Sequence, residues 1–146
     1  MTKVSGRPEQ IVVFATLEAL RGVSEAVESY LAQIDKIEDA EIVTYNIVLA
    51  VHELCTNIVT HAYAGEPGTI AIDLRLEEDP LRLVVSTQDK APHIFDKEGW
   101  TAPNLAEPQE HGLGIWLIQQ LMDEVNYQPA PGNNRWRLVK EIPQHL

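Results

Sequence analysis

Apolar residues along the chain follow two different periods, and each period predicts a different kind of element. Strict alternation of apolar and polar positions runs through residues 68–78, where Ile70, Ile72 and Leu74 occupy every second position. Because successive side chains of a strand point to opposite faces of a sheet, this pattern predicts a half-buried strand. We predict strands in four further short segments, at residues 10–17, 81–88, 124–128 and 134–142.

Helical spacing of the apolar residues replaces this alternation in three other segments. They predict helices over about residues 18–34, 39–64 and 112–125. Gly65 and Pro67 follow the second of these segments and are typical of a helix end. The pair Asp79–Pro80 separates two predicted strands and indicates a turn, so these strands are expected to form an antiparallel hairpin.

The order of the predicted elements is β-α-α-β-β-loop-α-β-β. Strands that follow one another along the chain and helices that are grouped favour an α+β two-layer sandwich over a doubly wound parallel sheet. The loop at residues 89–111 has no periodicity, and a loop of this length inside a compact domain is usually functional or disordered. We expect one domain spanning residues 1–146.

Charge and cysteine content narrow the classes of function. The formal net charge is −11 and the pI is about 4.7, which argues against a general nucleic-acid binder and against adsorption to anionic membranes. Cys55 is the one cysteine, so an intrachain disulfide is excluded. The sequence shows no uninterrupted apolar run long enough to span a membrane and no secretory pattern at its start, so we expect a cytoplasmic protein.

The second predicted helix contains the segment HELCTNIVTHAYAG, in which Glu53, Asn57 and His61 recur at intervals of four. On a helical wheel Glu53, Asn57 and Ala50 face away from the apolar arc, whereas His61 lies at its edge. A carboxylate in a cleft can act as a general base, and an amide oxygen one turn later can bind a hard cation such as Mg²⁺. The simpler alternative is the polar outer face of an amphipathic helix, and the pattern alone leaves both open.

Two further features could bind parts of a ligand. Gly112 and Gly114 open the third predicted helix after a candidate lid at residues 97–111, and free backbone N–H groups at a helix start attract anions. The alternative is that Gly112 merely begins the helix. Asp89 ends a predicted apolar strand, where its carboxylate could accept a hydrogen bond from an exocyclic amine or could simply stabilise a turn.

Taken together and in this order, these features resemble the GHKL ATPase superfamily, and within it the branch of anti-sigma factor serine kinases. The segments that carry the resemblance are ELCTN, HAY, the Asp at the strand end, GLGIWLIQQLMDEVNY and NRWRLVK. The resemblance implies a Bergerat-type ATP-binding fold, with a mixed but mostly antiparallel sheet and helices on one face.

The resemblance also implies roles for individual residues. Glu53 would activate a serine hydroxyl or a water, and Asn57 would hold Mg²⁺ against the phosphates of ATP. Asp89 would read the adenine amino group, and the run Gly112, Leu113 and Gly114 would border the phosphates. His61 would be structural and would bridge the helix to a loop. The implied partners are a sigma factor and a STAS-type anti-sigma factor antagonist whose serine is phosphorylated.

Three positions depart from the pattern of this branch. Ala91 stands in the adenine-binding segment where a glycine is usual, and Arg137 stands where a threonine near the adenine is usual. A long cation at position 137 would crowd the base pocket or point elsewhere. No arginine lies between Arg82 and Arg135, so the candidate lid has none.

These departures keep two alternatives to the kinase open. The first is a binding module that has lost catalysis and acts by sequestering its partner. The second is the ATPase domain of a sensor kinase, which we rank lower because we see no helix pair with a phosphoacceptor histidine before it. Exposed apolar residues near the first strand and first helix could also form a homodimer or a partner face.

Overall fold

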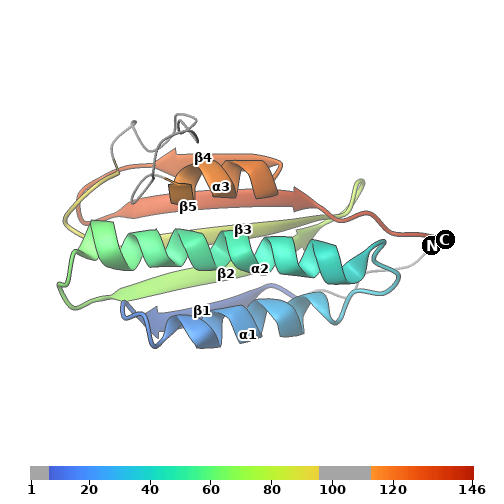
Figure 1. Ribbon diagram of the computed structural model, residues 1–146, viewed down its shortest axis with the longest axis horizontal. Coiled ribbons are helices and arrows are strands. Elements are labelled where there is room, and N and C mark those ends of the chain that lie inside the picture. Colours follow the sequence, from blue (N-terminus) through green and yellow to red (C-terminus); the bar gives the residue numbers. More distant parts are fainter. Residues whose placement is uncertain (1–6, 96–112) are drawn as a thin grey trace.

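The computed structural model describes residues 7–95 and 113–146, which form one antiparallel sheet with helices on a single face (Figure 1). The strand order across the sheet is β1-β2-β3-β5-β4. The elements in chain order are β1 (Glu9–Phe14), α1 (Leu20–Leu31), α2 (Ala40–Asn57), the π-helical segment η1 (Ile58–Tyr63), β2 (Thr69–Glu77), β3 (Arg82–Asp89), α3 (Leu113–Leu121), β4 (Glu124–Gln128) and β5 (Asn134–Glu141).

The predicted order of elements and the α+β two-layer class are confirmed. One detail of the expected fold is wrong, because every strand pair of the described sheet is antiparallel and the sheet is not mixed. Strand β1 ends at Phe14, three residues before its predicted end, because Phe14 pairs with Thr69, where β2 begins. The third helix ends at Leu121, four residues before its predicted end at residue 125. The chain continues as β4, whose Val125 pairs with Leu138 of β5.

The core lies between the sheet and the helices. From β2, Ile70, Ile72 and Leu74 are fully buried, as their alternation in the sequence predicts. Ile47 and Leu54 of α2 are also fully buried. Each such aliphatic side chain contributes about 1.5–3 kcal/mol when it leaves water, so this layer is the main source of stability.

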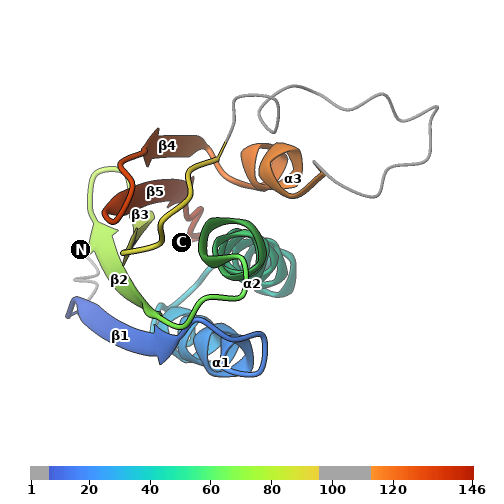
Figure 2. The same cartoon turned by 90° about the vertical axis from the view of Figure 1, so that its left-hand side faces the viewer.

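Helix α2 crosses the sheet between α1 and α3 (Figure 2). The helical segment Ala40–Tyr63 is long and apolar enough to span a membrane by length and composition, as the core helix of a soluble protein often is. Here the apolar residues of α2 contact the sheet, with Val51 and Leu54 almost completely buried. Packing within the fold therefore accounts for the apolar character of this helix.

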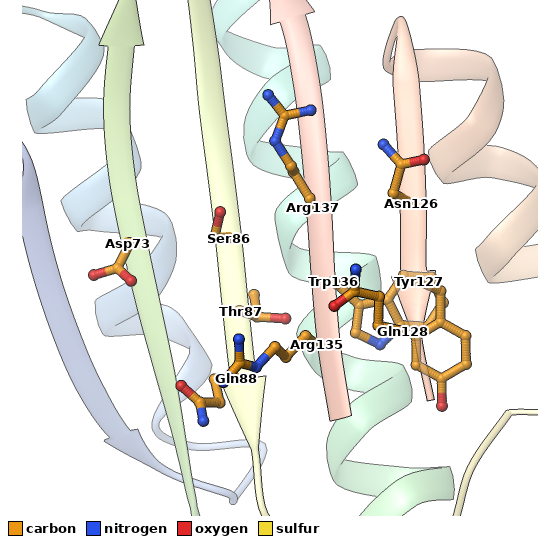
Figure 3. A pocket seen from close by; sticks show the side chains of 10 residues that line it. All are labelled: Asp73, Ser86, Thr87, Gln88, Asn126, Tyr127, Gln128, Arg135, Trp136 and Arg137. Atoms are coloured by element: carbon orange, nitrogen blue, oxygen red, sulfur yellow. The ribbon is translucent and has the colours of Figure 1, made fainter. Parts of the chain in front are cut away.

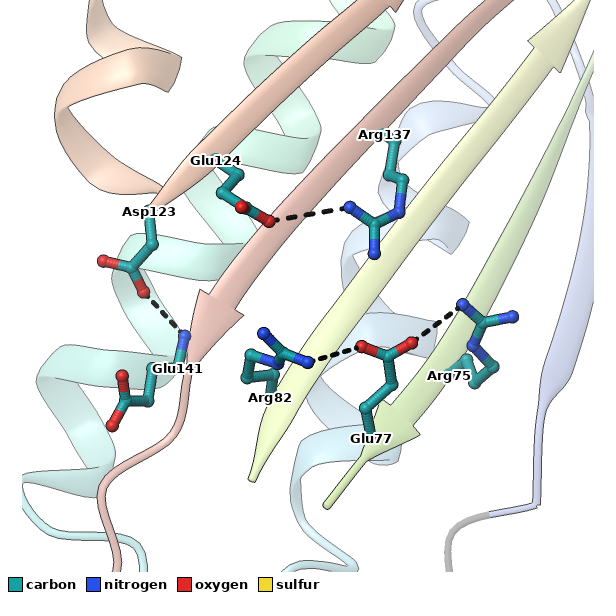
Figure 4. A network of polar contacts seen from close by, with 7 residues as sticks. All are labelled: Arg75, Glu77, Arg82, Asp123, Glu124, Arg137 and Glu141. Carbon is teal, nitrogen blue, oxygen red and sulfur yellow. Dashed lines mark hydrogen bonds and ion pairs between the residues drawn. The ribbon is translucent and has the colours of Figure 1, made fainter. Parts of the chain in front are cut away.

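The opposite face of the sheet carries no helix in the described part of the chain (Figure 2). This face has a pocket of about 600 Å³ over β3, β5 and β4. Ser86, Gln88, Arg135 and Arg137 are among the side chains that line the pocket (Figure 3). Ion pairs lie on the same face, where Glu77 contacts Arg82 at 3.1 Å and Arg75 at 3.2 Å (Figure 4). This face is separated by the sheet from the helical layer.

Candidate nucleotide-binding site

Glu53 and Asn57 lie on the face of α2 that turns toward α3. Both side chains are half-buried, and Ala50, which shares their face, is completely buried. As the helical wheel predicts, these residues lie on the side of α2 that faces away from the sheet. This side is not an open surface, because α3 covers part of it. A carboxylate and an amide in such a half-enclosed position can contact a ligand that enters from the remaining open side.

Gly114 in the first turn of α3 packs directly against the Asn57 amide. A Cβ atom at position 114 would lie 2.5 Å from Asn57 Nδ2 and 3.1 Å from Asn57 Oδ1. The first distance is shorter than a carbon–nitrogen contact allows and the second is tight, so any residue other than glycine would force the Asn57 amide or the start of α3 to shift. Gly112 and the candidate lid at 97–111 lie outside the described residues, and Leu113 is the first residue of α3.

Directly after Asn57 the helix widens into the π-helical segment η1. Such segments are rare and frequently mark functional sites. Tyr63 at the end of η1 donates its hydroxyl proton to Thr69 O and accepts a hydrogen bond from Lys90 N at 3.1 Å. The His61 ring lies edge-on to Phe95 at 6.0 Å between centroids, as the expected bridge between helix and loop requires. The segment after β3 is therefore held against the end of the long helix.

Asp89, the last residue of β3, is buried to 2% exposure. Its Oδ1 atom accepts hydrogen bonds from Ala91 N at 3.0 Å and from Asn134 Nδ2 at 3.2 Å. Its Oδ2 atom is buried without a hydrogen-bond partner among the described residues, as is Oγ1 of Thr87 on the same strand face. Burial raises the pKa of Asp89, and the two hydrogen bonds to Oδ1 oppose that rise.

A buried acceptor without a donor costs about 1–3 kcal/mol, so in native proteins such an atom usually receives a donor from a ligand or an ordered water. The carboxylate of Asp89 presents Oδ2 as this free acceptor at the end of a strand. An exocyclic amine, such as the amino group of adenine, supplies the donor that Oδ2 lacks. The residues around Asp89 therefore fit an adenine nucleotide.

Ala91 does not strain the segment in which a glycine was expected. The non-glycine residues with positive φ in the described chain are Lys36, Asp39, Ala64 and Asp79, so Ala91 has an ordinary backbone conformation. Ala91 is fully buried, and its carbonyl oxygen accepts a hydrogen bond from Gly132 N at 2.8 Å. The backbone here does not require the freedom of a glycine.

Arg137 lies on the polar outer face of the sheet and does not reach the base pocket. Alternation along β5 turns Trp136 and Leu138 toward the core and Arg137 away from it. Its Nη1 atom lies 3.6 Å from Glu124 Oε2 on the neighbouring strand (Figure 4). Of the two outcomes considered for this cation, crowding of the base is therefore wrong.

Sequence reasoning missed Asn134, which is the residue of β5 that faces Asp89. The two residues are paired directly in the register of β3 and β5, and Asn134 is 1% exposed. The sequence does place Asn134 at the start of the last predicted strand, directly after a turn. Only the register, which joins residues far apart in the chain, reveals its partner.

Comparison with known proteins identifies the family of this chain. Residues 13–140 match the model of a protein family described as the histidine kinase-like ATPase domain. The chain belongs to this histidine kinase-like ATPase family. Domains of this family use ATP, which agrees with the donor that Asp89 Oδ2 lacks.

Within the histidine kinase-like ATPases, the similar curated proteins belong to the RsbW branch. Serine-protein kinase RsbW of Bacillus licheniformis is 35% identical over 137 residues, which cover 89% of this chain and 78% of the relative. Serine-protein kinase RsbW of Bacillus pumilus is 33% identical with the same coverage of both chains. The chain therefore belongs to the RsbW branch of the family.

A solved structure shows the same fold. The RsbU and RsbW domains of Rv1364c from Mycobacterium tuberculosis superpose with a TM-score of 0.69 and 21% identity, over 94% of this chain and 32% of that one. A histidine kinase domain from Erythrobacter litoralis gives a TM-score of 0.52 at 18% identity. The histidine kinase-like ATPase fold expected from the sequence is confirmed.

Proposed function

We propose that this protein is an ATP- and Mg²⁺-dependent serine kinase that phosphorylates a STAS-type anti-sigma factor antagonist and sequesters a sigma factor. The observation that carries the proposal is the buried and unpaired Oδ2 atom of Asp89, which fits the amino group of adenine. The names of the RsbW relatives as serine-protein kinases support the reaction type.

Asn57 and the start of α3 are the part of the site assigned to the phosphates. Asn57 Oδ1 would bind Mg²⁺, and Gly112, Leu113 and Gly114 would border the phosphates with backbone N–H groups. The close contact between Gly114 and the Asn57 amide supports this assignment, because it brings the proposed metal ligand to the start of a helix. When bound, ATP supplies the phosphoryl group and Mg²⁺ neutralises its charge.

Glu53 is the proposed general base. It precedes Asn57 by one helical turn, and residues in this relation have Cβ atoms about 5–6 Å apart on one face. The Glu53 carboxylate would accept the proton of the serine hydroxyl as this oxygen attacks. The side chain is half-buried, so it can meet a protein substrate that enters from the open side of the site.

The partners and compartment complete the proposal. An antagonist and a sigma factor would alternate on the protein in the cytoplasm, without direct contact with nucleic acid or membrane. A homodimer is supported by the edge strand β1, where Val12 is 60% and Phe14 is 73% exposed. Apolar side chains this exposed on a sheet edge are typical of a surface that another chain covers.

Two of the three reasons for the catalytically inactive alternative are weakened by the structure. Ala91 has an ordinary backbone conformation, and Arg137 lies outside the base pocket. The third reason, the lid without an arginine, concerns residues that the structure does not describe. A kinase therefore explains the described part of the site better than an inactive binding module.

A phosphotransfer assay tests the proposal. Wild-type protein is mixed with ATP labelled in its terminal phosphate, Mg²⁺ and a candidate STAS-type antagonist, and serine phosphorylation of the antagonist is measured by mass spectrometry. We expect labelled serine with the wild type and none after Asn57→Ala or without Mg²⁺. Tight nucleotide binding by the wild type with no phosphoserine on any STAS-type antagonist would favour the inactive module.

A further inference from the structure

Asn134 of β5 connects β3, the segment that follows β3, β4 and the turn between β4 and β5. It has no role in the proposed phosphoryl transfer. Its Nδ2 group lies 3.2 Å from Asp89 Oδ1, 3.4 Å from Ala91 O and 3.1 Å from His93 O. Its Oδ1 atom accepts hydrogen bonds from Ala130 N at 3.1 Å and from the Tyr127 hydroxyl at 3.2 Å. A buried amide with contacts on both ends holds one orientation.

The direction of these hydrogen bonds is fixed by groups that can only donate. Ala130 N–H must donate, so the oxygen of the Asn134 amide faces it and the NH₂ group faces Asp89. Phe95 N–H donates to the Tyr127 oxygen at 3.0 Å, so the Tyr127 hydroxyl proton is available for Asn134 Oδ1. The chain of donors runs from Phe95 through Tyr127 and Asn134 and ends on Asp89 Oδ1.

This direction decides where a proton can reside on Asp89. Oδ1 already receives two donors, from Ala91 N and Asn134 Nδ2, whereas Oδ2 receives none. A proton bound by Asp89 would therefore sit on Oδ2 and would turn the base-reading atom from an acceptor into a donor. Ionised, Oδ2 suits the amino group of adenine; protonated, it suits a purine with a carbonyl oxygen at that ring position.

We propose that Asn134 is a positioning residue that keeps Asp89 ionised and oriented, and thereby makes the site select adenine over a 6-oxopurine. This inference rests on the proposed ATP site and names what sets its base specificity. Asn134 acts through Asp89, whose Oδ1 it occupies, and needs no contact with the nucleotide. It also ties Ala91 and His93 to β5, which fixes the segment that follows Asp89.

Three further titratable groups that face Asp89 are neutral at and below pH 8. They are Cys55 from α2, Tyr63 from η1 and Tyr127 from β4, and each feels the Asp89 charge. Burial raises the pKa of Cys55 to about 12 and raises those of both tyrosines above their ordinary value. None of these three groups therefore changes its charge at or below pH 8.

The test compares ADP with inosine diphosphate, which differs at one ring position by a carbonyl oxygen in place of the amino group. Calorimetry at a series of pH values, from the most acidic pH at which the protein stays folded up to pH 8, gives the ratio of the two dissociation constants. In Asn134→Leu, which has no donor, the pH at which the preference for ADP disappears should rise by about one unit. At a fixed pH within the titration, this corresponds to an approximately tenfold smaller preference.

Asn133→Ala is the matched control, because Asn133 is the exposed neighbour whose Oδ1 accepts a bond from Gln88. It should keep the wild-type pH profile. A ratio in Asn134→Leu that follows the wild type at every pH would overturn the inference, as would an equal change in Asn133→Ala.

A second measurement needs no variant and remains decisive if Asn134→Leu fails to fold. In wild-type protein, NMR signals of the Asn134 side-chain NH₂ group should shift with the same midpoint as the Asp89 carboxyl carbon during a pH titration. Asn134 signals that ignore the titration of Asp89 would overturn the inference. If the wild type binds neither nucleotide, the proposed function fails, and this titration still decides the link between the two residues.

Discussion

The two ends of the proposed nucleotide site are built differently. At the base end, Asp89 and Asn134 are almost fully buried and bonded to each other and to the backbone. At the phosphate end, Glu53 and Asn57 are half-buried, and neither makes a side-chain hydrogen bond or ion pair among residues 7–95 and 113–146. The protein itself thus holds the proposed base-reading group in place, while the proposed phosphate-binding groups have no such partners among these residues.

This contrast separates affinity from rate. Groups that are already held in place bind a ligand without a further loss of freedom, so the base end should dominate nucleotide affinity and specificity. Groups that acquire their partners from the reactants should act chiefly in the chemical step. Variants at the two ends are therefore expected to fail in different assays.

The largest effect is expected from Glu53→Gln. Loss of a general base typically lowers a rate by about 10²–10⁴-fold, and the variant should lower kcat for serine phosphorylation in this range. Its affinity for ADP should stay within about threefold of the wild type, since Glu53 is assigned to proton transfer and not to the base. His52→Ala is the control, because His52 is the exposed neighbour on the same helix. An unchanged rate would remove Glu53 from the chemistry.

Asp89→Asn should weaken nucleotide binding, which Glu53→Gln leaves nearly unchanged. The amide that replaces Oδ2 offers a donor to the adenine amino group, and the loss of a hydrogen bond to a charged acceptor weakens binding by roughly 10–100-fold. The dissociation constant of ADP should rise by this amount in calorimetry. Asp73→Asn, an exposed change on β2, should leave it unaltered. ADP affinity equal to the wild type would show that Asp89 does not read the base.

The same variant should make the fold more stable at neutral pH. Because burial raises the pKa of Asp89, its contribution to stability is present in full below the ordinary pKa of an aspartate. This contribution is lost as the pH rises through the higher folded pKa, so the wild type carries the cost of a buried charge at pH 7. Asp89→Asn should melt a few degrees above the wild type at pH 7, and the difference should shrink as the pH falls.

Gly114→Ala should disturb the phosphate end through packing. The added Cβ would meet Asn57 Nδ2 at 2.5 Å and displace either the amide or the start of α3. We expect Mg²⁺-dependent binding of ATP to weaken by about tenfold, with binding in EDTA changed less. Gly22→Ala is a matched glycine-to-alanine control on α1, because its Cβ would meet no atom within 4 Å. Equal behaviour of the two variants would show that the Gly114–Asn57 contact is unimportant.

The smallest effect is expected from Arg137→Ala. The ion pair with Glu124 is solvent-exposed and contributes at most about 1 kcal/mol to the free energy of unfolding. The dissociation constant of ADP should change less than twofold, because the sheet lies between this side chain and Asp89. A tenfold change of this dissociation constant in either direction would show that Arg137 does contact the base pocket.

Much of the fold was predictable from the sequence because local periodicity encodes it. The alternation in β2 and the helical spacing in α2 reflect which side chains meet the core, and both survive in the structure. The position of Glu53 and Asn57 on one face of α2 followed from the same geometry. The burial of Ala50 did not, because it depends on α3, whose placement over α2 no local pattern encodes.

The base end was less predictable because it depends on strand register. Asp89 was recognised as the end of a strand, but its partner Asn134 comes from a strand 45 residues later. Arg137 was matched to the adenine by position within a motif, although alternation along β5 already places it on the face of Arg135. Strand parity was the better guide, because side-chain direction in a strand follows from backbone geometry alone.

A crystal structure with ADP and Mg²⁺ would show whether the free oxygen of Asp89 reads the base. We expect the adenine amino group within hydrogen-bond distance of Asp89 Oδ2, Asn134 still bonded to Oδ1, and the metal at Asn57. An adenine ring bound elsewhere, with Oδ2 of Asp89 still lacking a donor from the nucleotide, would contradict this expectation.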